Sequence, residues 1–331
     1  MSFWHNRRVL ITGAGGFIGS HLTESLVRAG AVVSAMVHYN SRNDWGHIEL
    51  LDKKIRESLS VICGDIRDPF FCREAVKNQS LVLHLAALIA IPYSYRAPVD
   101  YVFTNVIGTL NILQACRDAG VEKIVHTSTS ETYGTAQYIP IDEKHPLQGQ
   151  SPYAASKIGA DKIAESFYCS FKTPVVTIRP FNTFGPRQSA RAVIPTIIVQ
   201  LASGMEQIRL GSLAPVRDLS YVDDTVAGFM AVAESSKTTG ELINIGSGQG
   251  ISVGNLARLI ADLMGVDVEI VCDTQRIRPE ESEVMQLVAC TDKAKKLTSW
   301  EPRTTLREGL LKTIAFISNN INIYKPYIYN I

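Results

Sequence analysis

Three glycines at a fixed spacing, immediately after a short apolar run, restrict the fold of this chain more than any other feature. The run at residues 9–11 leads into Gly13, Gly16 and Gly19, and a helical pattern begins within the same segment. Glycines at a strand-to-helix turn allow a sharp bend and a close backbone approach, and the free N–H groups of the helix start attract phosphate. The segment therefore predicts a strand–turn–helix unit that binds the pyrophosphate of a dinucleotide.

Short β-branched runs alternate with longer helical patterns from residue 9 to about residue 177. This alternation is typical of repeated βαβ units around a parallel sheet. The predicted strands cover residues 8–11, 32–37, 60–63, 81–85, 123–127 and 175–178. The predicted helices cover residues 18–29, 69–76, 99–119 and 154–171. We therefore expect an α/β fold with a Rossmann-like, doubly wound parallel sheet.

The chain beyond Phe181 loses this regular alternation and has frequent proline and glycine, with one amphipathic helical pattern at residues 253–264. A length of 331 residues exceeds the size that one core usually supports. We expect residues 1–180 to form a dinucleotide-binding domain, with a return segment near residues 217–248. Residues 181–331 are expected to form mainly a smaller, C-terminal substrate-binding lobe.

The composition predicts a globular protein without a large charged surface. Hydrophobic residues make up 46% of the chain and charged residues 20%, which allows an extensive core. A net charge of +1 favours neither nucleic acid nor an anionic membrane as a partner. We find no signal-peptide core and no apolar stretch long enough to span a bilayer, so a cytoplasmic location is expected.

The cysteines predict neither a metal site nor a redox pair. Six of them are scattered along the chain, at Cys63, Cys72, Cys116, Cys169, Cys272 and Cys290. Zinc sites and redox dithiols need closely spaced Cys or His pairs, and these spacings are too wide. We therefore expect reduced thiols and no metal.

Tyr153 and Lys157 lie four residues apart, which places them on one face of a predicted helix. An unperturbed tyrosine has a pKa of about 10, and a nearby ammonium group favours the phenolate. We therefore expect Lys157 to lower the pKa of Tyr153, so that the phenolate can accept a proton from a substrate hydroxyl. Hydride can then pass from the same carbon to a nicotinamide.

Three further segments, together with these motifs, resemble a known family. They are Ser128-Thr-Ser-Glu-Thr-Tyr-Gly134, the run from Pro140 to Lys157, and Arg179-Pro-Phe-Asn-Thr-Phe-Gly-Pro-Arg-Gln188. The chain resembles extended short-chain dehydrogenases/reductases of the NAD-dependent epimerase/dehydratase family over nearly its whole length. Within that family it is most similar to nucleotide-sugar 4,6-dehydratases of the legionaminic and pseudaminic acid pathways. This resemblance implies UDP- or GDP-linked N-acetylglucosamine as the substrate.

The resemblance also implies a set of cofactor-binding residues. These are Gly13, Gly16, Phe17, Ile18 and Gly19 at the pyrophosphate, Asp65 and Ile66 beside the adenine, and Leu85, Ala86, Ala87, Tyr153 and Lys157 along the rest of the cofactor. The acidic residue that usually holds the adenosine ribose of NAD is missing after the second predicted strand. Asn40 can bind ribose hydroxyls there, whereas Arg42 can meet the 2′-phosphate of NADP. NAD is the preferred cofactor, and NADP stays open.

By the same resemblance, Thr129, Ser130 and Glu131 complete the catalytic set with Tyr153 and Lys157. Thr129 is expected to hydrogen-bond the reacting sugar oxygen, and the Ser-Glu pair after it is the pattern of GDP-mannose 4,6-dehydratases. Tyr153 then removes the O4 proton as C4 is oxidised, and Glu131 takes the acidified C5 proton before water leaves from C6. The donor for the departing hydroxyl stays open, because Ser130 is a weak acid and Glu131 can do both jobs.

Three positions match the family's contacts to the nucleotide diphosphate, namely Asn182, Arg217 and Arg278. An arginine can form a bidentate pair with a phosphate, and the amide of Asn182 can hydrogen-bond a phosphate oxygen. The alternative for the two arginines is a salt bridge to a neighbouring acid, Asp218 or Glu280.

Two other functions fit part of this pattern. A C5 or C4 epimerase, or a 5,6-ene isomerase on a UDP-4-keto-6-deoxy-N-acetylhexosamine intermediate, would use Thr129, Tyr153 and Lys157 equally well. A non-catalytic sensor on the same fold is less consistent, because such sensors typically lose the Tyr/Lys pair. The family usually dimerises by pairing the long helices that follow Val99 and Tyr153, so a homodimer is expected.

Overall fold

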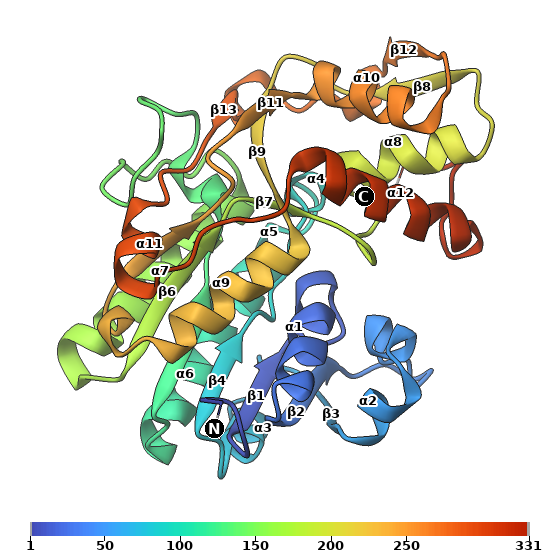
Figure 1. The fold of residues 1–331 in the computed structure, drawn as a ribbon. Coiled ribbons are helices and arrows are strands. Elements are labelled where there is room, and N and C mark those ends of the chain that lie inside the picture. The colour runs from blue at the N-terminus through green and yellow to red at the C-terminus, as the bar shows by residue number, and fades with distance from the viewer. Residues whose placement is uncertain (1, 330–331) are drawn as a thin grey trace.

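Seven parallel strands form the central sheet, in the order β10-β6-β5-β4-β1-β2-β3 (Figure 1). The computed structural model describes residues 2–329. The strands of this sheet are β1 (Arg8–Thr12), β2 (Val32–His38), β3 (Ser60–Gly64), β4 (Leu81–His84), β5 (Lys123–Thr127), β6 (Val175–Pro180) and β10 (Leu242–Ile245). The direction of winding reverses between β1 and β4, and open α/β sheets bind ligands outside such a point. The predicted Rossmann-like, doubly wound fold is therefore confirmed.

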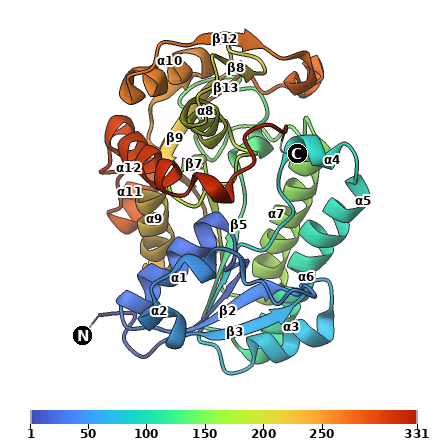
Figure 2. The same ribbon diagram turned by 90° about the vertical axis from the view of Figure 1, so that its right-hand side faces the viewer.

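Helices cover both faces of the sheet, as Figure 2 shows. α1 (Phe17–Arg28) and α9 (Val222–Glu234) pack together on one face, whereas α3 (Pro69–Val76), α6 (Gly108–Ala119) and α7 (Pro152–Phe171) cover the other. Apolar side chains at almost zero exposure fill both interfaces. Burial of each large aliphatic side chain stabilises the fold by roughly 1.5–3 kcal/mol, so the two layers hold the sheet rigidly.

The smaller lobe begins where β6 runs on into β7, and it lies on one side of the sheet (Figure 1). It contains β7 (Asn182–Phe184), β8 (Gln207–Leu210), β9 (Val216–Tyr221), β11 (Gly250–Ser252), β12 (Glu269–Cys272), β13 (Gln286–Leu287), α8 (Val193–Ala202), α10 (Val253–Met264) and α12 (Leu306–Asn319). β9 pairs with β7, β11 and β13, and β8 pairs with β12. After β9, the chain returns through α9 to β10 at the edge of the main sheet and then re-enters the smaller lobe at β11. The two parts therefore interleave.

Short elements connect these layers. They are η1 (Gly46–Leu50), α2 (Lys53–Glu57), α4 (Ile91–Ser94), α5 (Pro98–Tyr101), the π-helix η2 (Val102–Ile107), η3 (Ser130–Tyr133), η4 (Ser236–Thr238), η5 (Thr274–Arg276), η6 (Glu280–Ser282), α11 (Asp292–Thr298) and η7 (Ile321–Ile323). Within the described residues, no helix combines the length and apolar character that crossing a bilayer requires.

The helix predicted over residues 99–119 is confirmed as one unbroken helical run, but its middle part, η2 between α5 and α6, is a π-helix that the sequence did not predict. The π-helix carries Asn105, whose Oδ1 accepts the N–H of Leu88 at 2.8 Å. The amide nitrogen of Asn105 donates to the hydroxyl of Ser156 in α7 at 2.9 Å. Asn105 therefore ties the loop after β4 to the helix that carries Tyr153. A local widening of the helix is a common feature near functional residues.

The glycine turn after β1 is shaped by close backbone contacts. Gly13 has a φ of +72°, and a Cβ atom placed on it would lie 2.8 Å from the backbone nitrogen of Ala86. A Cβ atom on Gly19 would overlap the carbonyl oxygen of Gly13. Both positions therefore exclude side chains, and the turn can press against the start of α1 and the loop after β4.

We predict that Gly19→Ala lowers the free energy of unfolding by about 1–3 kcal/mol, because the added methyl group forces the turn away from α1. Urea denaturation measures this change. Gly254→Ala is the matched control, because Gly254 also lies in the first turn of a helix and its Cβ would meet Leu213 at an ordinary 3.4 Å. A Gly19→Ala variant as stable as the control would contradict the prediction.

Candidate active site

The end of β5 places Thr129 and Glu131 on a short helical turn. β5 ends at Thr127, and Thr129 then caps η3 by accepting the N–H of Glu131 at 3.3 Å. The hydroxyl of Thr132 donates back to the carbonyl of Thr129 at 2.7 Å. Ser130 is 2% exposed and therefore does not face solvent. The cap fixes the direction in which Thr129 and Glu131 leave the strand.

α7 carries Tyr153 and Lys157 toward the same strand end. Ser151 starts the helix by accepting the N–H of Ala154 at 3.1 Å. One turn later, the Nζ of Lys157 donates to the carbonyl oxygen of Thr127 at 2.6 Å. The phenol of half-buried Tyr153 is hydrogen-bonded to the side chain of Thr129. The structure therefore brings Thr129, Tyr153 and Lys157 together, as the sequence predicted.

Burial, rather than the charge of Lys157, is the main influence on the pKa of Tyr153. Burial raises the pKa of Tyr153 above its ordinary value, and the hydrogen bond from Thr129 only partly offsets this. Burial also lowers the pKa of Lys157 to about 8, although the Asp161 carboxylate opposes that shift. The reason is that both groups are withdrawn from water while the Lys157 ammonium is held by the Thr127 carbonyl. In the free protein, Tyr153 is therefore a neutral phenol.

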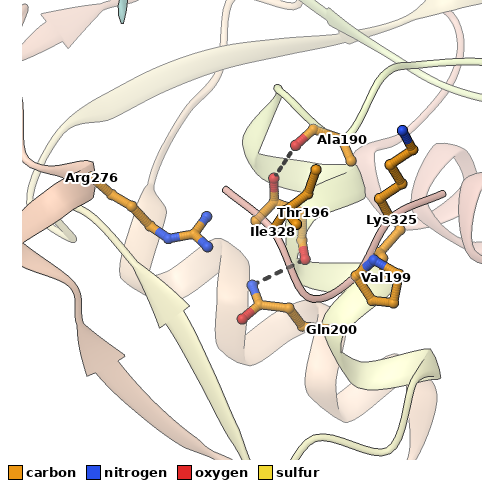
Figure 3. A pocket seen from close by; sticks show the side chains of 8 residues that line it. Ala190, Thr196, Val199, Gln200, Arg276, Lys325 and Ile328 are labelled. Atoms are coloured by element: carbon orange, nitrogen blue, oxygen red, sulfur yellow. Dashed lines mark hydrogen bonds between the residues drawn. The ribbon is translucent and has the colours of Figure 1, made fainter. Parts of the chain in front are cut away.

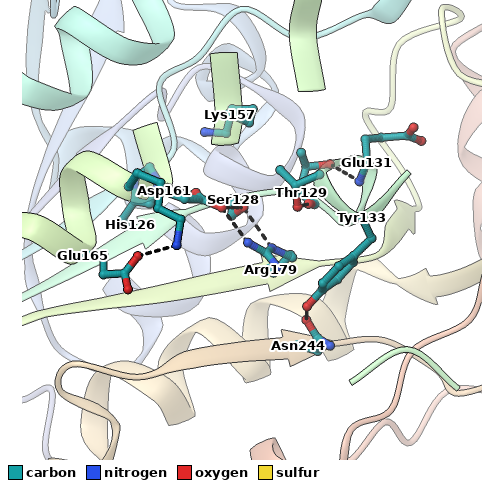
Figure 4. A network of polar contacts seen from close by, with 12 residues as sticks. His126, Ser128, Thr129, Glu131, Tyr133, Lys157, Asp161, Glu165, Arg179 and Asn244 are labelled. Carbon is teal, nitrogen blue, oxygen red and sulfur yellow. Dashed lines mark hydrogen bonds and ion pairs between the residues drawn. The ribbon is translucent and has the colours of Figure 1, made fainter. Parts of the chain in front are cut away.

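A buried polar network lies behind Lys157, and Figure 4 shows its centre at Asp161. The carboxylate of Asp161 accepts from Ser128 Oγ at 2.6 Å and from the Arg179 guanidinium at 2.7 Å. It also bonds the Nε2 of fully buried His126 at 2.9 Å. Burial works against ionisation of Asp161, but the His126 hydrogen bond and the Arg179 charge outweigh it and hold the pKa below its ordinary value.

The same network reaches the far edge of the sheet. Arg179, which is 1% exposed, places its guanidinium carbon 4.4 Å from the ring centre of Tyr133. The hydroxyl of Tyr133 donates to Asn244 in β10 at 2.8 Å. Sequence reasoning missed Asp161, although its position four residues after Lys157 on the same helix face was an available signal. The partners of Asp161 come from β5 and β6, which sequence spacing cannot bring together.

Glu131 is a buried carboxylate beside the catalytic candidates. It is 8% exposed, and within the described residues its Oε2 atom has no hydrogen-bond partner. Its negative charge acts on Tyr153 and on the guanidinium of Arg217. Buried polar atoms are normally paired, so an unpaired carboxylate oxygen indicates a group that meets something bound from outside. Glu131 is therefore not an ordinary surface carboxylate.

The two predicted phosphate-binding arginines meet at one carboxylate. Arg217 and Arg278 each donate to Oε1 of Glu283 at 3.3 Å. The alternative partners, Asp218 and Glu280, are wrong, because Asp218 accepts backbone N–H groups and Glu280 is exposed. Glu283 lies 66 residues after Arg217 but only five after Arg278, and sequence reasoning missed it as their shared partner.

Asn182 lies at the junction between the two parts of the chain. It begins β7, directly where the chain leaves the main sheet, and pairs with Leu219 of β9. Within residues 2–329, its side-chain Oδ1 is buried and has no hydrogen-bond partner. Asn182 therefore presents an unused acceptor at the carboxyl end of the parallel strands, the end at which Thr129 and Glu131 also lie.

The glycine turn supplies a cradle that fits a dinucleotide. Gly16 precedes α1 as its N-cap, and no side chain caps this helix end. Phe17, Ile18 and Gly19 form the first turn of α1, whose N–H groups can meet a pyrophosphate. Ala86 approaches from the other side and donates its N–H to Thr12 Oγ1 at 3.1 Å. The predicted residues Leu85 and Ala87 flank Ala86 in this loop.

Two of the predicted adenosine-binding side chains, Asn40 and Asp65, already make contacts within the free protein. The Asn40 side chain accepts the N–H groups of Arg42 and Asp44, each at 3.1 Å, and so braces its own loop. Arg42 itself is exposed. Asp65 forms an ion pair with Arg67 at 2.6 Å.

Ile66 lies in the core rather than on the surface. It is 4% exposed and packs against Gly108, where a Cβ atom would come within 2.5 Å of it. A further contact that sequence reasoning missed joins η1 to the glycine turn, where the N–H of His47 meets the carbonyl of Gly15 at 2.9 Å.

One small hollow lies away from the candidate residues. A small cavity of about 10 Å³, enough for one water, lies between α8 and the C-terminal segment (Figure 3). Its lining residues are Ala190, Thr196, Val199, Gln200, Arg276, Lys325, Pro326 and Ile328. Among residues 2–329, no group of three His, Cys, Asp or Glu side chains is arranged to hold a metal ion.

We predict that Asp161→Asn lowers the free energy of unfolding by about 3–5 kcal/mol at neutral pH, because it leaves the buried Arg179 without a counter-charge. The pKa of Asp161 is lower in the folded protein than in the unfolded chain. The stabilisation that ionised Asp161 provides is therefore complete above about pH 4 and decreases gradually as the pH falls further. The difference in unfolding free energy between the variant and wild type should narrow near pH 3. Urea denaturation at both pH values tests this, with the exposed Asp118→Asn as control. A difference independent of pH would contradict it.

Comparison with known proteins gives the family. The family model described as GDP-mannose 4,6 dehydratase matches residues 10–313. The human dTDP-D-glucose 4,6-dehydratase is 31% identical, over 96% of this chain and 92% of that protein.

Solved structures of both dehydratases and epimerases share the fold. A DesIV double mutant, a dTDP-glucose 4,6-dehydratase from Streptomyces venezuelae with NAD and DAU bound, is 28% identical with a TM-score of 0.87, over 96% of this chain and 99% of that one. A mutant UDP-glucuronic acid 4-epimerase from Bacillus cereus, with NAD and UDP-4-deoxy-4-fluoro-glucuronic acid, is 26% identical with a TM-score of 0.87, over 95% and 99%. The chain therefore belongs to the GDP-mannose 4,6-dehydratase family, within the NAD-dependent epimerase/dehydratase group of short-chain dehydrogenases/reductases.

Proposed function

We propose that this enzyme is a nucleotide-sugar 4,6-dehydratase that acts on N-acetylglucosamine linked to UDP or GDP, with NAD as its cofactor. The observation that carries this proposal is Glu131, a buried carboxylate with an unpaired oxygen close enough to influence Tyr153 electrostatically. Dehydration needs a base at C5 in addition to one at O4. Tyr153 and Glu131 supply two such groups side by side.

NAD fits the cradle formed by the glycine turn and the loop after β4. Gly13 and Gly19 leave no room for side chains there, and the uncapped start of α1 offers N–H groups to a pyrophosphate. When bound, NAD supplies the capacity to accept a hydride from C4 and to return it to C6. The structures of related enzymes that contain NAD support this assignment.

Tyr153 is the base for the O4 hydroxyl in this proposal, and Thr129 orients the same oxygen by hydrogen bonding. Lys157 lies one helical turn away, with a pKa of about 8 that leaves most of the group charged at neutral pH. A positive charge near a phenol favours the phenolate. Burial raises the pKa of Tyr153 in the free protein, so in this proposal binding of the cofactor and the sugar favours its basic form.

Glu131 is the base for C5. Oxidation of C4 to a ketone acidifies the neighbouring C5–H bond, and the carboxylate then accepts that proton. Loss of the C6 hydroxyl as water follows. Arg217, Arg278 and Asn182 hold the diphosphate, with Glu283 keeping the two arginines in place before the substrate arrives.

The second candidate is a C5 or C4 epimerase, or a 5,6-ene isomerase, on a UDP-4-keto-6-deoxy-N-acetylhexosamine. The same Glu131 that favours dehydration would also remove the C5 proton in a C5 epimerase. The similarity to the Bacillus cereus 4-epimerase supports this alternative, because epimerases and dehydratases share the fold.

The protein is also proposed to form a homodimer through the face made by α5, η2 and α7. Val99, Val102 and Phe103 on this face are 63%, 49% and 52% exposed. Exposed apolar side chains that gather on one face are typical of surfaces that bind another protein. A second copy of the chain would cover them by pairing the same helices.

We predict that the purified enzyme dehydrates UDP- or GDP-N-acetylglucosamine in deuterated water without added NAD. The product should lack one water, carry a new C6 methyl group and contain deuterium at C5, because Glu131 exchanges its proton with solvent. NMR and mass spectrometry with each nucleotide sugar separately identify the preferred nucleotide. Deuterium at C5 without loss of water would instead indicate an epimerase or isomerase.

We predict that Glu131→Gln slows dehydration by about 10²–10⁴-fold, because the amide cannot accept the C5 proton. Oxidation at C4 should persist, since Thr129, Tyr153 and Lys157 are unchanged, and it is followed by the absorbance of reduced nicotinamide. Glu165→Gln, an exposed carboxylate on α7, is the matched control and should leave dehydration unchanged. Equal loss of C4 oxidation and dehydration in Glu131→Gln would show that Glu131 is not the C5 base.

A further inference from the structure

The proposed dehydration needs a proton donor for the C6 hydroxyl. Hydroxide is a poor leaving group, so this oxygen must receive a proton as the C6–O6 bond breaks. Glu131 must be ionised to accept the C5 proton and so cannot carry a proton for O6 at the start of that step. Ser130 is almost fully buried, and a serine hydroxyl is a very weak acid. Glu131 can give a proton to O6 only after it has taken one from C5, so a second acidic group near Glu131 would let O6 be protonated as the C6–O6 bond breaks.

Tyr95 is the candidate for this proton donor. It follows α4, in the loop after β4, and its phenol oxygen is 2.6 Å from the hydroxyl of Ser282 in η6. This bond reaches from the sheet domain to the segment that carries Arg278 and Glu283. The ring is 37% exposed, so the phenol can exchange protons with solvent.

The charges around Tyr95 are those of the proposed substrate site. The phenol is under the electrostatic influence of Arg278, Glu283 and Glu131. Glu131 acts in turn on both Tyr153 and Arg217. The hydrogen bond to Ser282 places Tyr95 beside the segment whose Glu283 binds both arginines, and the charge of Glu131 also acts on the Tyr95 phenol.

We propose that Tyr95 is the acid that protonates the departing C6 hydroxyl. This role rests on the proposed dehydratase function and names a catalytic residue that the sequence patterns do not include. Burial raises the pKa of Tyr95, so the phenol carries a proton at neutral pH. After transfer, Arg278 and the Ser282 hydroxyl favour the phenolate, the first through its charge and the second by donating a hydrogen bond.

The step balances as follows. Glu131 accepts the C5 proton, and the electron pair of that bond forms the C5–C6 double bond. The C6–O6 bond breaks, its electron pair goes to O6, and O6 takes the proton of Tyr95 and leaves as water. The hydride taken from C4 returns to C6, Glu131 returns a proton to C5, and solvent reprotonates the Tyr95 phenolate.

The test compares Tyr95→Phe with wild type on two substrates, the natural nucleotide sugar and its 6-deoxy-6-fluoro analogue. Fluoride leaves without a proton, so the analogue does not need the acid. We expect Tyr95→Phe to lose about 10²–10⁴-fold in dehydration of the natural sugar. Exchange of the C5 proton for deuterium should continue in this variant. Fluoride release from the analogue should stay within a few-fold of wild type.

Two matched variants separate this role from a structural one. Ser282→Ala removes the hydrogen-bond partner of Tyr95 but keeps the phenol, so it should lose less dehydration activity than Tyr95→Phe. Tyr93→Phe removes the hydroxyl of another tyrosine near α4, with a ring equally exposed at 37%, and should behave like wild type. If Tyr95→Phe loses both reactions equally, Tyr95 only holds η6 in place, and the proposal fails.

The outcomes also separate this proposal from the proposed function. If wild type removes water from the sugar and Tyr95→Phe does so at the same rate, the enzyme is a dehydratase and Tyr95 is not its acid. If wild type exchanges the C5 proton but removes neither water nor fluoride, the dehydratase function itself is overturned, and the role of Tyr95 with it.

Discussion

The carboxylate of Asp161 is the constraint on which the rest of the site depends. Asp161 lies on the buried face of α7. Its carboxylate accepts hydrogen bonds from Ser128, directly after β5, and from Arg179 of the neighbouring strand β6. A buried charge of this kind is costly unless it is paired and fully hydrogen-bonded. The energetic penalty for separating these partners therefore fixes α7 against the sheet in one arrangement.

That arrangement determines the geometry of the catalytic candidates. Lys157 lies one turn before Asp161, and its ammonium donates to the carbonyl of Thr127. Thr129 lies two residues after Thr127. Tyr153, one further turn back, meets Thr129. Asp161 also opposes the loss of charge that burial imposes on Lys157. One buried carboxylate thus serves both to position the pair and to keep its ammonium charged.

The sequence predicts much of the sheet domain, because strand and helix periodicity is a local property. Six of its strands and the long helix carrying Tyr153 lie where the pattern places them, and the catalytic candidates meet as expected. The π-helix around Asn105 was not predictable, because it depends on a hydrogen bond to Leu88 in another loop. The partner of Arg217 and Arg278 was not predictable either. Glu283 is only five residues from Arg278, but it meets Arg217, 66 residues away, only through the folding of the smaller lobe.

The pairing of two arginines with Glu283 has a consequence for substrate binding. Burial lowers the pKa of Arg217, which means that its charge is already partly removed from water before any ligand arrives. Glu283 compensates that charge in the free protein, so both guanidinium groups stay ordered and close together. A diphosphate carries more negative charge than one carboxylate and offers more acceptor oxygens, so it can replace Glu283 at these groups. In the proposed function, substrate binding then does not have to order two flexible side chains.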